Sequence, residues 1–124
     1  MTNPYKGATG LRRIWNACGY SIEGLITAYR GEAAFRQLVW MAVVLIPVAI
    51  ILPVTPLSRA LLIGSVLLSL IIELLNSAIE AAIDRISMET HPLSKASKDM
   101  SSAAQMLGLV LLATVWGLVL LDNF

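Results

Sequence analysis

The sequence predicts an all-α integral membrane protein, in which one N-terminal surface helix and three transmembrane helices form a single domain, 1–124. Composition is the first reason: 57% of the 124 residues are hydrophobic, 14% are charged, and the mean hydropathy is +0.77. These values are typical of a membrane chain rather than a soluble domain. The second reason is that three long stretches carry little or no charge, each close to the ~20 residues that a spanning helix needs.

A basic amphipathic helix is predicted at about 9–30. Apolar residues such as Leu11, Ile14 and Trp15 recur there at helical spacing, and Arg12 and Arg13 belong to the opposite side. A helix with an apolar face and a basic face is suited to lying on a surface of anionic lipid headgroups. The alternative is a helix that packs on a soluble partner.

The predicted transmembrane helices cover about 36–55, 60–86 and 98–121. The first contains Pro47 and would act as its own insertion signal, because no cleavable signal pattern precedes it. Pro53 and Pro56 predict a tight turn between the first and second spans. The segment from Asp84 to Asp99 is rich in charge, with Pro92 as a helix breaker. We interpret this segment as a loop that carries functional groups.

Lysine and arginine are unevenly distributed, and their pattern predicts the orientation of the chain. Five precede the first span, one lies between the first two spans, three lie between the second and third, and none follows. In chain order they are Lys6, Arg12, Arg13, Arg30, Arg36, Arg59, Arg85, Lys95 and Lys98. The positive-inside rule then places the N-terminus and the second connection in the cytoplasm. The net charge of +1 gives no indication of nucleic-acid binding, and we expect no such partner.

Four polar residues share one face of the second span: Glu73, Asn76, Glu80 and Asp84. At 100° per residue they lie within a stripe about 80° wide. A carboxylate inside a membrane helix costs about 2.5–3.5 kcal/mol on insertion scales, so this stripe should face protein, water or ligand. Because the helix runs inward, Glu80 is expected near its cytoplasmic end and Glu73 about 10 Å deeper, at headgroup depth.

This depth favours a reaction on a lipid headgroup. Glu73 is a candidate general base. Glu80, together with Glu32 at the entry to the first span, is a candidate ligand of Mg²⁺, which takes one or two carboxylates plus phosphate oxygens. The side chains available to contact phosphate or nucleotide are Arg13, Arg85, His91 and Lys98. The chain has no P-loop and no kinase-type glycine loop, so an ATP site here would be of another kind.

Residue types alone leave other interpretations open. Glu73, Asn76 and Glu80 are also residues that join membrane helices by hydrogen bonds, as in a non-catalytic assembly subunit. Intramembrane carboxylates also build proton or ion paths, so a small ion conductor is a second alternative. The charged segment that contains His91 and Lys98 favours the kinase interpretation, because a proton path does not need it.

Three segments carry specific wording: Glu-Ala-Ala-Phe-Arg-Gln at 32–37, Glu-Leu-Leu-Asn-Ser-Ala-Ile-Glu-Ala-Ala-Ile-Asp-Arg at 73–85, and Glu-x-His-x-Leu-Ser-x-x-x-Lys-Asp-Met at 89–100. They closely resemble the prokaryotic diacylglycerol kinase family, and the resemblance covers nearly the whole chain. It implies a small enzyme of the bacterial inner membrane, a homotrimer of three-span protomers. The implied reaction transfers the γ-phosphate of MgATP to diacylglycerol and produces phosphatidic acid.

The resemblance also implies roles for individual residues, by motif position. Glu73 would be the base that deprotonates the lipid hydroxyl, with Asn76 beside it, and Glu32 and Glu80 would be ligands of the metal and of ATP. Further nucleotide contacts would be Arg13, Tyr20, Glu89, His91, Lys98 and Asp99. Lipid-substrate contacts would be Arg13, Ser21, Ala34, Phe35, Arg36, Gln37, Glu73 and Ser102.

Leu38 and Ile22 depart from the family pattern, in which a glutamate and a tryptophan are common at these positions. Both touch the lipid region, so they bear on substrate selectivity more than on reaction type. Similar enzymes phosphorylate undecaprenol with nearly the same second span, and the segment 32–37 favours the diacylglycerol branch. We expect direct in-line transfer without a phosphoenzyme, because no cysteine and no paired serine and histidine lie at the site.

Overall fold

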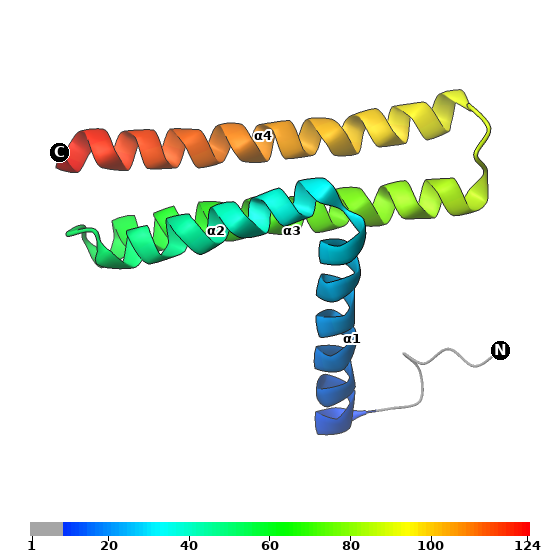
Figure 1. The fold of residues 1–124 in the computed structure, drawn as a ribbon, viewed down its shortest axis with the longest axis horizontal. Coiled ribbons are helices and arrows are strands. Elements are labelled where there is room, and N and C mark those ends of the chain that lie inside the picture. Colours follow the sequence, from blue (N-terminus) through cyan, green and yellow to red (C-terminus); the bar gives the residue numbers. More distant parts are fainter. Residues whose placement is uncertain (1–8) are drawn as a thin grey trace.

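The computed structural model describes residues 9–124; residues 1–8, which include Lys6, lie outside the described part of the chain. The described residues form four helices, α1 (Gly10–Gly31), α2 (Ala33–Ile51), α3 (Pro56–Ile86) and α4 (Pro92–Asn123). α2, α3 and α4 lie side by side in alternating directions, and α1 runs crosswise to them (Figure 1). The prediction of an all-α chain, with one N-terminal helix followed by three helices long and apolar enough to span a membrane, is therefore confirmed.

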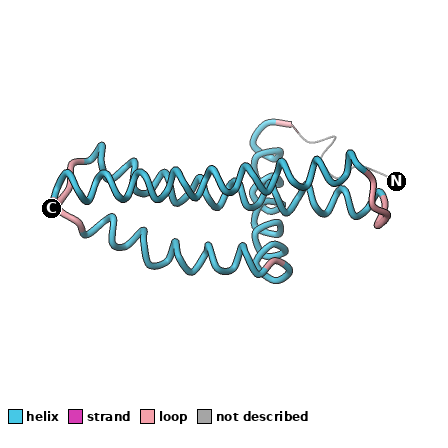
Figure 2. Tube along the Cα trace, turned by 90° about the horizontal axis from the view of Figure 1, so that it is seen from above, coloured by secondary structure: helices cyan, strands magenta, loops and turns pink. Residues whose placement is uncertain are grey.

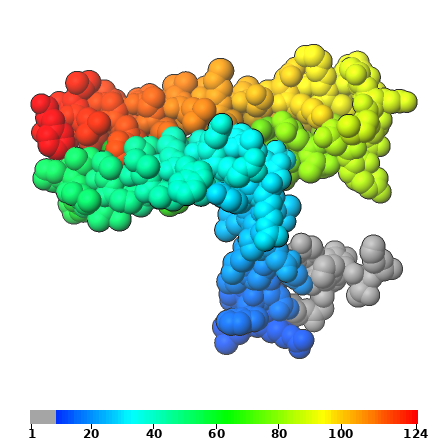
Figure 3. All heavy atoms as spheres, in the orientation of Figure 1, coloured from blue at the N-terminus to red at the C-terminus, as the bar shows by residue number. Residues whose placement is uncertain are grey.

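The break between α1 and α2 is a single residue. Glu32 has extended backbone angles, φ −121° and ψ 109°, and serves as both the C-cap of α1 and the N-cap of α2. The carbonyl oxygens at the end of α1 lose their helical partners there. Arg36 replaces them, because its Nη1 donates to the carbonyl oxygens of Tyr29 at 2.9 Å and Arg30 at 3.0 Å. One residue therefore sets the crosswise course of α1, which stands away from the other helices as an arm (Figure 3).

The connection between α2 and α3 is a tight turn, as its prolines predict. α2 continues through Pro47 and ends at Ile51. α3 begins at Pro56, and the hydroxyl of its N-cap Thr55 accepts from the backbone N–H of Ser58, an arrangement in which a proline at the first helical position costs no hydrogen bond. Arg59 closes the turn, because it donates to the carbonyl oxygens at the end of α2.

The segment from Asp84 to Asp99 is mostly helical rather than a loop. α3 ends at Ile86, as the predicted span 60–86 requires, so Asp84 belongs to its last turns. α4 begins at Pro92, six residues before the predicted start at about 98, so Asp99 belongs to its second turn. The proline ends no helix here: its fixed φ suits the first position of α4, and its missing N–H would have had no helical partner there. The non-helical connection is confined to 87–91.

α3 is the central span, because it packs against both α2 and α4. Seen from above, α2 lies to one side of the α3–α4 pair, and this pair continues beyond the level at which α1 joins (Figure 2). Two clusters of buried residues hold the three spans together, Ala42 with Val66 and Leu112, and Ala49 with Leu62 and Val119.

The outer faces of the spans remain apolar and exposed. Val44 is 61% exposed and Leu107 is 65% exposed. Burying a side chain of this size is worth about 1.5–3 kcal/mol, so a soluble protein would not leave so many uncovered. α2, α3 and α4 are each long and apolar enough to cross a bilayer. The chain is therefore organised as a membrane protein, whose outer faces are covered by lipid or by other protein.

Candidate functional site

Glu73 lies in the interface between α3 and α4, and only 6% of it is exposed. Its Oε2 accepts a hydrogen bond from Nε2 of Gln105 on α4, at 3.0 Å. The same Nε2 donates to the backbone carbonyl oxygen of Ser69, one turn earlier on α3, also at 3.0 Å. The carboxylate predicted as a base is therefore buried, and a donor from the neighbouring helix holds it in place.

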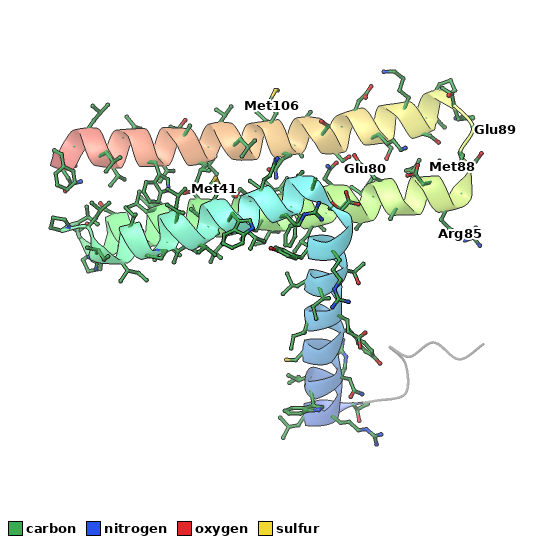
Figure 4. All side chains as sticks on the ribbon, viewed as in Figure 1. Met41, Glu80, Arg85, Met88, Glu89 and Met106 are labelled. Atoms are coloured by element: carbon green, nitrogen blue, oxygen red, sulfur yellow. The ribbon has the colours of Figure 1, made fainter. Side chains whose placement is uncertain are left out.

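Asn76 and Glu80 follow Glu73 along α3, as the predicted polar stripe requires. Both are half-buried, and Oδ1 of Asn76 is buried without a hydrogen-bond partner in the described part of the chain. Glu80 lies on the part of α3 that extends beyond the junction with α1 (Figure 4). The stripe thus runs from a buried interface toward the end of the α3–α4 pair.

A pocket of about 360 Å³ lies where α3 and α4 are joined. It brings together four side chains that were predicted as nucleotide contacts: Glu89, His91, Lys98 and Asp99. Nζ of Lys98 donates to Oδ1 of Asp84 at 2.7 Å, which connects the two helices across the pocket. One turn from it, Nζ of Lys95 donates to Oδ2 of Asp99 at 2.6 Å. The pocket therefore presents cations, carboxylates and an imidazole to the solvent.

His91 has a defined place at this pocket, because it is the N-cap of α4. Its Nδ1 accepts the backbone N–H of Leu93 at 3.1 Å. In a neutral imidazole the other nitrogen then carries the proton, so Nε2 is a donor that points away from the helix backbone. Its side chain is thus oriented to offer one N–H to a ligand in the pocket.

Two further pockets flank α1, where the lipid contacts were predicted. One, of about 630 Å³, lies between α1 and α3; Ser21 and Glu32 line one wall and Ser77 and Ala81 line the other. The second, of about 500 Å³, lies between α1 and α2 and includes Phe35. Phe35 itself is 2% exposed, so its ring forms part of the packed wall.

Other predicted site residues are not brought to these places within one chain. Arg13 lies in a shallow apolar depression near the start of α1, together with Leu11 and Ile14. Arg85 points away from α4 (Figure 4). It does not line the pocket of about 360 Å³ at the connection between α3 and α4, which we call the loop pocket. Three of the remaining lipid contacts are exposed on α2 and α4: Ala34, Gln37 and Ser102. Tyr20 is half-buried on α1, and Arg36 is engaged with the end of α1.

The predicted metal ligands, Glu32 and Glu80, are carboxylates, the oxygen ligands that a hard cation prefers. Within residues 9–124 no three histidine, cysteine, aspartate or glutamate side chains lie close enough together to hold a metal ion. Mg²⁺ does not need such a cage, since it usually takes one or two carboxylates and completes its shell with phosphate oxygens and water. Glu32 and Glu80 carry carboxylate oxygens of that kind, so their chemistry fits Mg²⁺.

Gln105 is the site residue that the sequence-based prediction missed. The signal was present as a spacing in α4, where Ser101, Gln105 and Gly108 fall at i, i+4 and i+7, small and polar residues in an apolar helix. Such positions favour close contact between membrane helices. The spacing did not identify the residue that it meets, because helix periodicity does not specify how two helices are aligned.

Comparisons with known proteins identify the family to which the chain belongs. The family model described as prokaryotic diacylglycerol kinase matches residues 19–120. A protein of Pseudomonas aeruginosa named diacylglycerol kinase is 60% identical over 119 residues, which are 96% of this chain and 97% of that protein. The diacylglycerol kinase of Escherichia coli K12 is 45% identical over 116 residues, 94% of this chain and 95% of the relative. That of Helicobacter pylori J99 is 46% identical over 117 residues, 94% and 91% of the two chains. These matches confirm the resemblance seen in the three motifs: the chain belongs to the prokaryotic diacylglycerol kinase family.

Proposed function

We propose that this chain transfers the γ-phosphoryl group of ATP to the free hydroxyl of diacylglycerol at the cytoplasmic face of the bacterial inner membrane. The family and the names of its relatives support this reaction. The observation in the structure that carries it is the buried Glu73 carboxylate, held by Gln105 where α3 passes α1. We place this carboxylate at the depth of the lipid headgroups, where a lipid hydroxyl can reach a base most easily.

The position of α1 supports the depth of the site. Apolar side chains of α1 are exposed in the chain, with Trp15 at 79% and Ile22 at 58%, as a helix on a lipid surface requires. α1 faces α3 across a pocket whose α3 wall runs from Leu74 to Ala81. If α1 lies in the headgroup layer, Glu73 is at that layer. The loop pocket is then on the cytoplasmic side, which agrees with a cytoplasmic N-terminus.

One carboxylate oxygen of Glu73 is available to accept the proton. Its Oε2 is occupied by the amide of Gln105, so Oε1 is the oxygen that takes the hydroxyl proton of the lipid. The lipid oxygen then bonds to the γ-phosphorus as the bond between that phosphorus and the β,γ-bridging oxygen breaks, and ADP leaves. A positioned general base of this kind contributes roughly 10²–10⁴-fold.

The loop pocket suits the nucleotide. Lys98 offers a cation and His91 an Nε2–H, and both can meet phosphate or base groups from the solvent side. Glu32 and Glu80 would hold Mg²⁺ as it enters with ATP. When bound, the metal neutralises negative charge that builds up on the phosphate oxygens.

A homotrimer would bring together site residues that lie apart within one chain, and it would cover apolar faces that one chain leaves exposed. Arg13 and Tyr20 lie on α1, apart from the residues that line the loop pocket. The outer faces of the spans are apolar and uncovered. We propose that neighbouring protomers cover part of these faces and that α1 of one protomer supplies residues to the site of another.

The test is a phosphotransfer assay in mixed micelles with MgATP. The purified chain should phosphorylate dioleoylglycerol, and Glu73→Gln should remove nearly all of this activity. Undecaprenol, assayed under the same detergent conditions, should give a much lower initial rate. Faster transfer to undecaprenol would assign the chain to the polyprenol branch. Transfer to neither lipid by a folded protein would reject the kinase proposal.

A further inference from the structure

Glu73 depends on one residue of the neighbouring helix. Among the residues that the structure describes, Gln105 is the side chain that donates to its carboxylate. We infer that Gln105 is a positioning residue, which holds the Glu73 carboxylate in the orientation for proton abstraction; this inference rests on the function proposed above. Nothing in the sequence motifs that identify the family assigns a role to Gln105.

The orientation of the Gln105 amide follows from its neighbours. Its nitrogen lies 3.0 Å from two acceptors, the carboxylate oxygen of Glu73 and the backbone carbonyl oxygen of Ser69. An amide nitrogen carries two N–H donors, so it satisfies both. A flipped amide would place its oxygen against two acceptors and would be repelled. The chemistry therefore selects the orientation in which Gln105 donates to Glu73.

Gly108 provides the room for this amide. Gln105 is 9% exposed, and a β-carbon added at Gly108 would lie 3.0 Å from Oε1 of Gln105 and 2.7 Å from Cδ1 of Ile72. The absence of a side chain at Gly108 lets α4 approach α3 closely enough for the amide to reach two positions one turn apart. Gln105 and Gly108 therefore depend on each other: the glycine leaves the space, and the amide fills it.

The arrangement is costly, which is why we assign it a function. Oε1 of Gln105 is buried and has no hydrogen-bond partner within the described residues. An unpaired buried acceptor costs about 1–3 kcal/mol. An apolar residue at position 105 would avoid this cost, but it would leave the buried carboxylate of Glu73 without its donor. The gain from glutamine is thus specific to the carboxylate.

The hydrogen bond restricts how the carboxylate can turn. With Oε2 fixed, Oε1 keeps one direction relative to α3, and the incoming hydroxyl meets it in that direction. Loss of the donor frees rotation about the terminal torsion of Glu73, which is intrinsically broad. Misplacement of a reacting group by about 1 Å costs on the order of 10²-fold in rate. Loss of the Gln105 donor should lower turnover rather than nucleotide affinity, because the loop pocket, where we propose that the nucleotide binds, lies at the end of the α3–α4 pair.

The test is Gln105→Met, which keeps the length of the side chain and removes its N–H donors. We expect kcat with dioleoylglycerol to fall at least about tenfold, while KM for MgATP stays within about twofold and thermal unfolding in micelles occurs near the wild-type temperature. Ser65→Ala is the matched control. Ser65 is also buried on α3, but its hydroxyl donates within its own helix to the carbonyl oxygen of Leu62, so kcat should be unchanged.

A double-variant cycle separates this inference from the proposed function. If Gln105 acts through Glu73, then Gln105→Met should reduce the residual rate of Glu73→Gln no further. Wild-type kcat in Gln105→Met, with Glu73→Gln inactive, would overturn the positioning role and leave the base intact. If kcat of Gln105→Met falls and its unfolding temperature falls clearly below that of the wild type as well, the role of Gln105 is structural only, and the positioning role is also overturned. Wild-type turnover in Glu73→Gln would reject the base itself, and with it the role of Gln105.

Discussion

Lys98 and Asp84 form an ion pair that joins the end of α3 to the start of α4, with 2.7 Å between Nζ and Oδ1. The two side chains are 40% and 44% exposed. A pair as exposed as this contributes little to stability, because water and salt screen it. Its main consequence is therefore the placement of the Lys98 ammonium group at the mouth of the loop pocket, where two of its three N–H donors remain available for phosphate.

Replacement of Lys98 by methionine should weaken nucleotide binding. We expect KM for MgATP to rise at least about tenfold, because a hydrogen bond from a charged donor to phosphate is roughly twice as strong as a neutral one. Asp84→Asn should raise it about two- to fivefold, since the ammonium loses its orientation but not its charge. Arg85→Met removes the same charge from a side chain that points away from α4 (Figure 4), so it should have little effect. Equal increases in Lys98→Met and Arg85→Met would show that only the overall charge matters.

Glu80 and Glu73 should respond differently to the same substitution. Glu80→Gln removes a proposed metal ligand, so we expect KM for MgATP to rise and the rate to recover partly at high Mg²⁺. Glu73→Gln should leave KM for MgATP nearly unchanged and reduce kcat by about 10²-fold or more. Initial rates over a matrix of ATP and Mg²⁺ concentrations measure both effects. A fall in kcat alone in Glu80→Gln would contradict the ligand role.

Gly108→Ala should loosen the contact between α3 and α4. The added methyl group would lie 2.7 Å from Cδ1 of Ile72, and overpacking of this kind costs about 1–3 kcal/mol. The double variant Gly108→Ala, Ile72→Val lacks that Cδ1 and should recover most of the thermal stability. Gly117→Ala is the control on the same helix, because nothing lies within 4 Å of its added methyl group. It should be neutral or stabilising, since alanine is the better helix former. A Gly117→Ala loss as large as that of Gly108→Ala would contradict this explanation.

Arg59→Gln should destabilise the α2–α3 turn without affecting catalysis. The guanidinium group donates to the carbonyl oxygens of Ala49 at 3.0 Å and Leu52 at 2.9 Å, with a longer contact of 3.4 Å to Val54. Loss of these donors at the end of α2 should cost about 1–3 kcal/mol. Since Arg59 is about 20 Å along α3 from Glu73, kcat of the folded enzyme should be unchanged. Unfolding by SDS titration, with kcat measured below the transition, checks both. Arg59→Lys should recover only part of the stability, because lysine lacks the planar fork.

The helices were predictable because each is long and strongly patterned. The apolar stretches identify α2, α3 and α4, and the alternation of apolar and basic residues identifies α1. The boundary near Pro92 was less predictable, because a proline can end one helix or begin the next. His91 decides between these outcomes, since its ring caps the new helix.

The candidate site was predictable only in part, for a physical reason. The stripe that contains Glu73 and Glu80 follows from the geometry of one helix. Gln105 depends on how α4 is aligned against α3, which close packing at Gly108 determines and helix periodicity does not. Arg36 and Arg59 illustrate the same limit, because their charges predict orientation, whereas their donation to helix-end carbonyl oxygens requires the folded backbone.

The junction at Glu32 has a consequence for how this chain can change in length. α1 and α2 share that one residue as a cap, so no further linker residue separates the surface helix from the first span. One residue added to or lost from the final turn of α1 would rotate its outer part by about 100°. Leu11 and Trp15 would then turn away from the side on which we propose that α1 meets the bilayer. Insertions and deletions should therefore be excluded from this corner even where individual side chains can be exchanged.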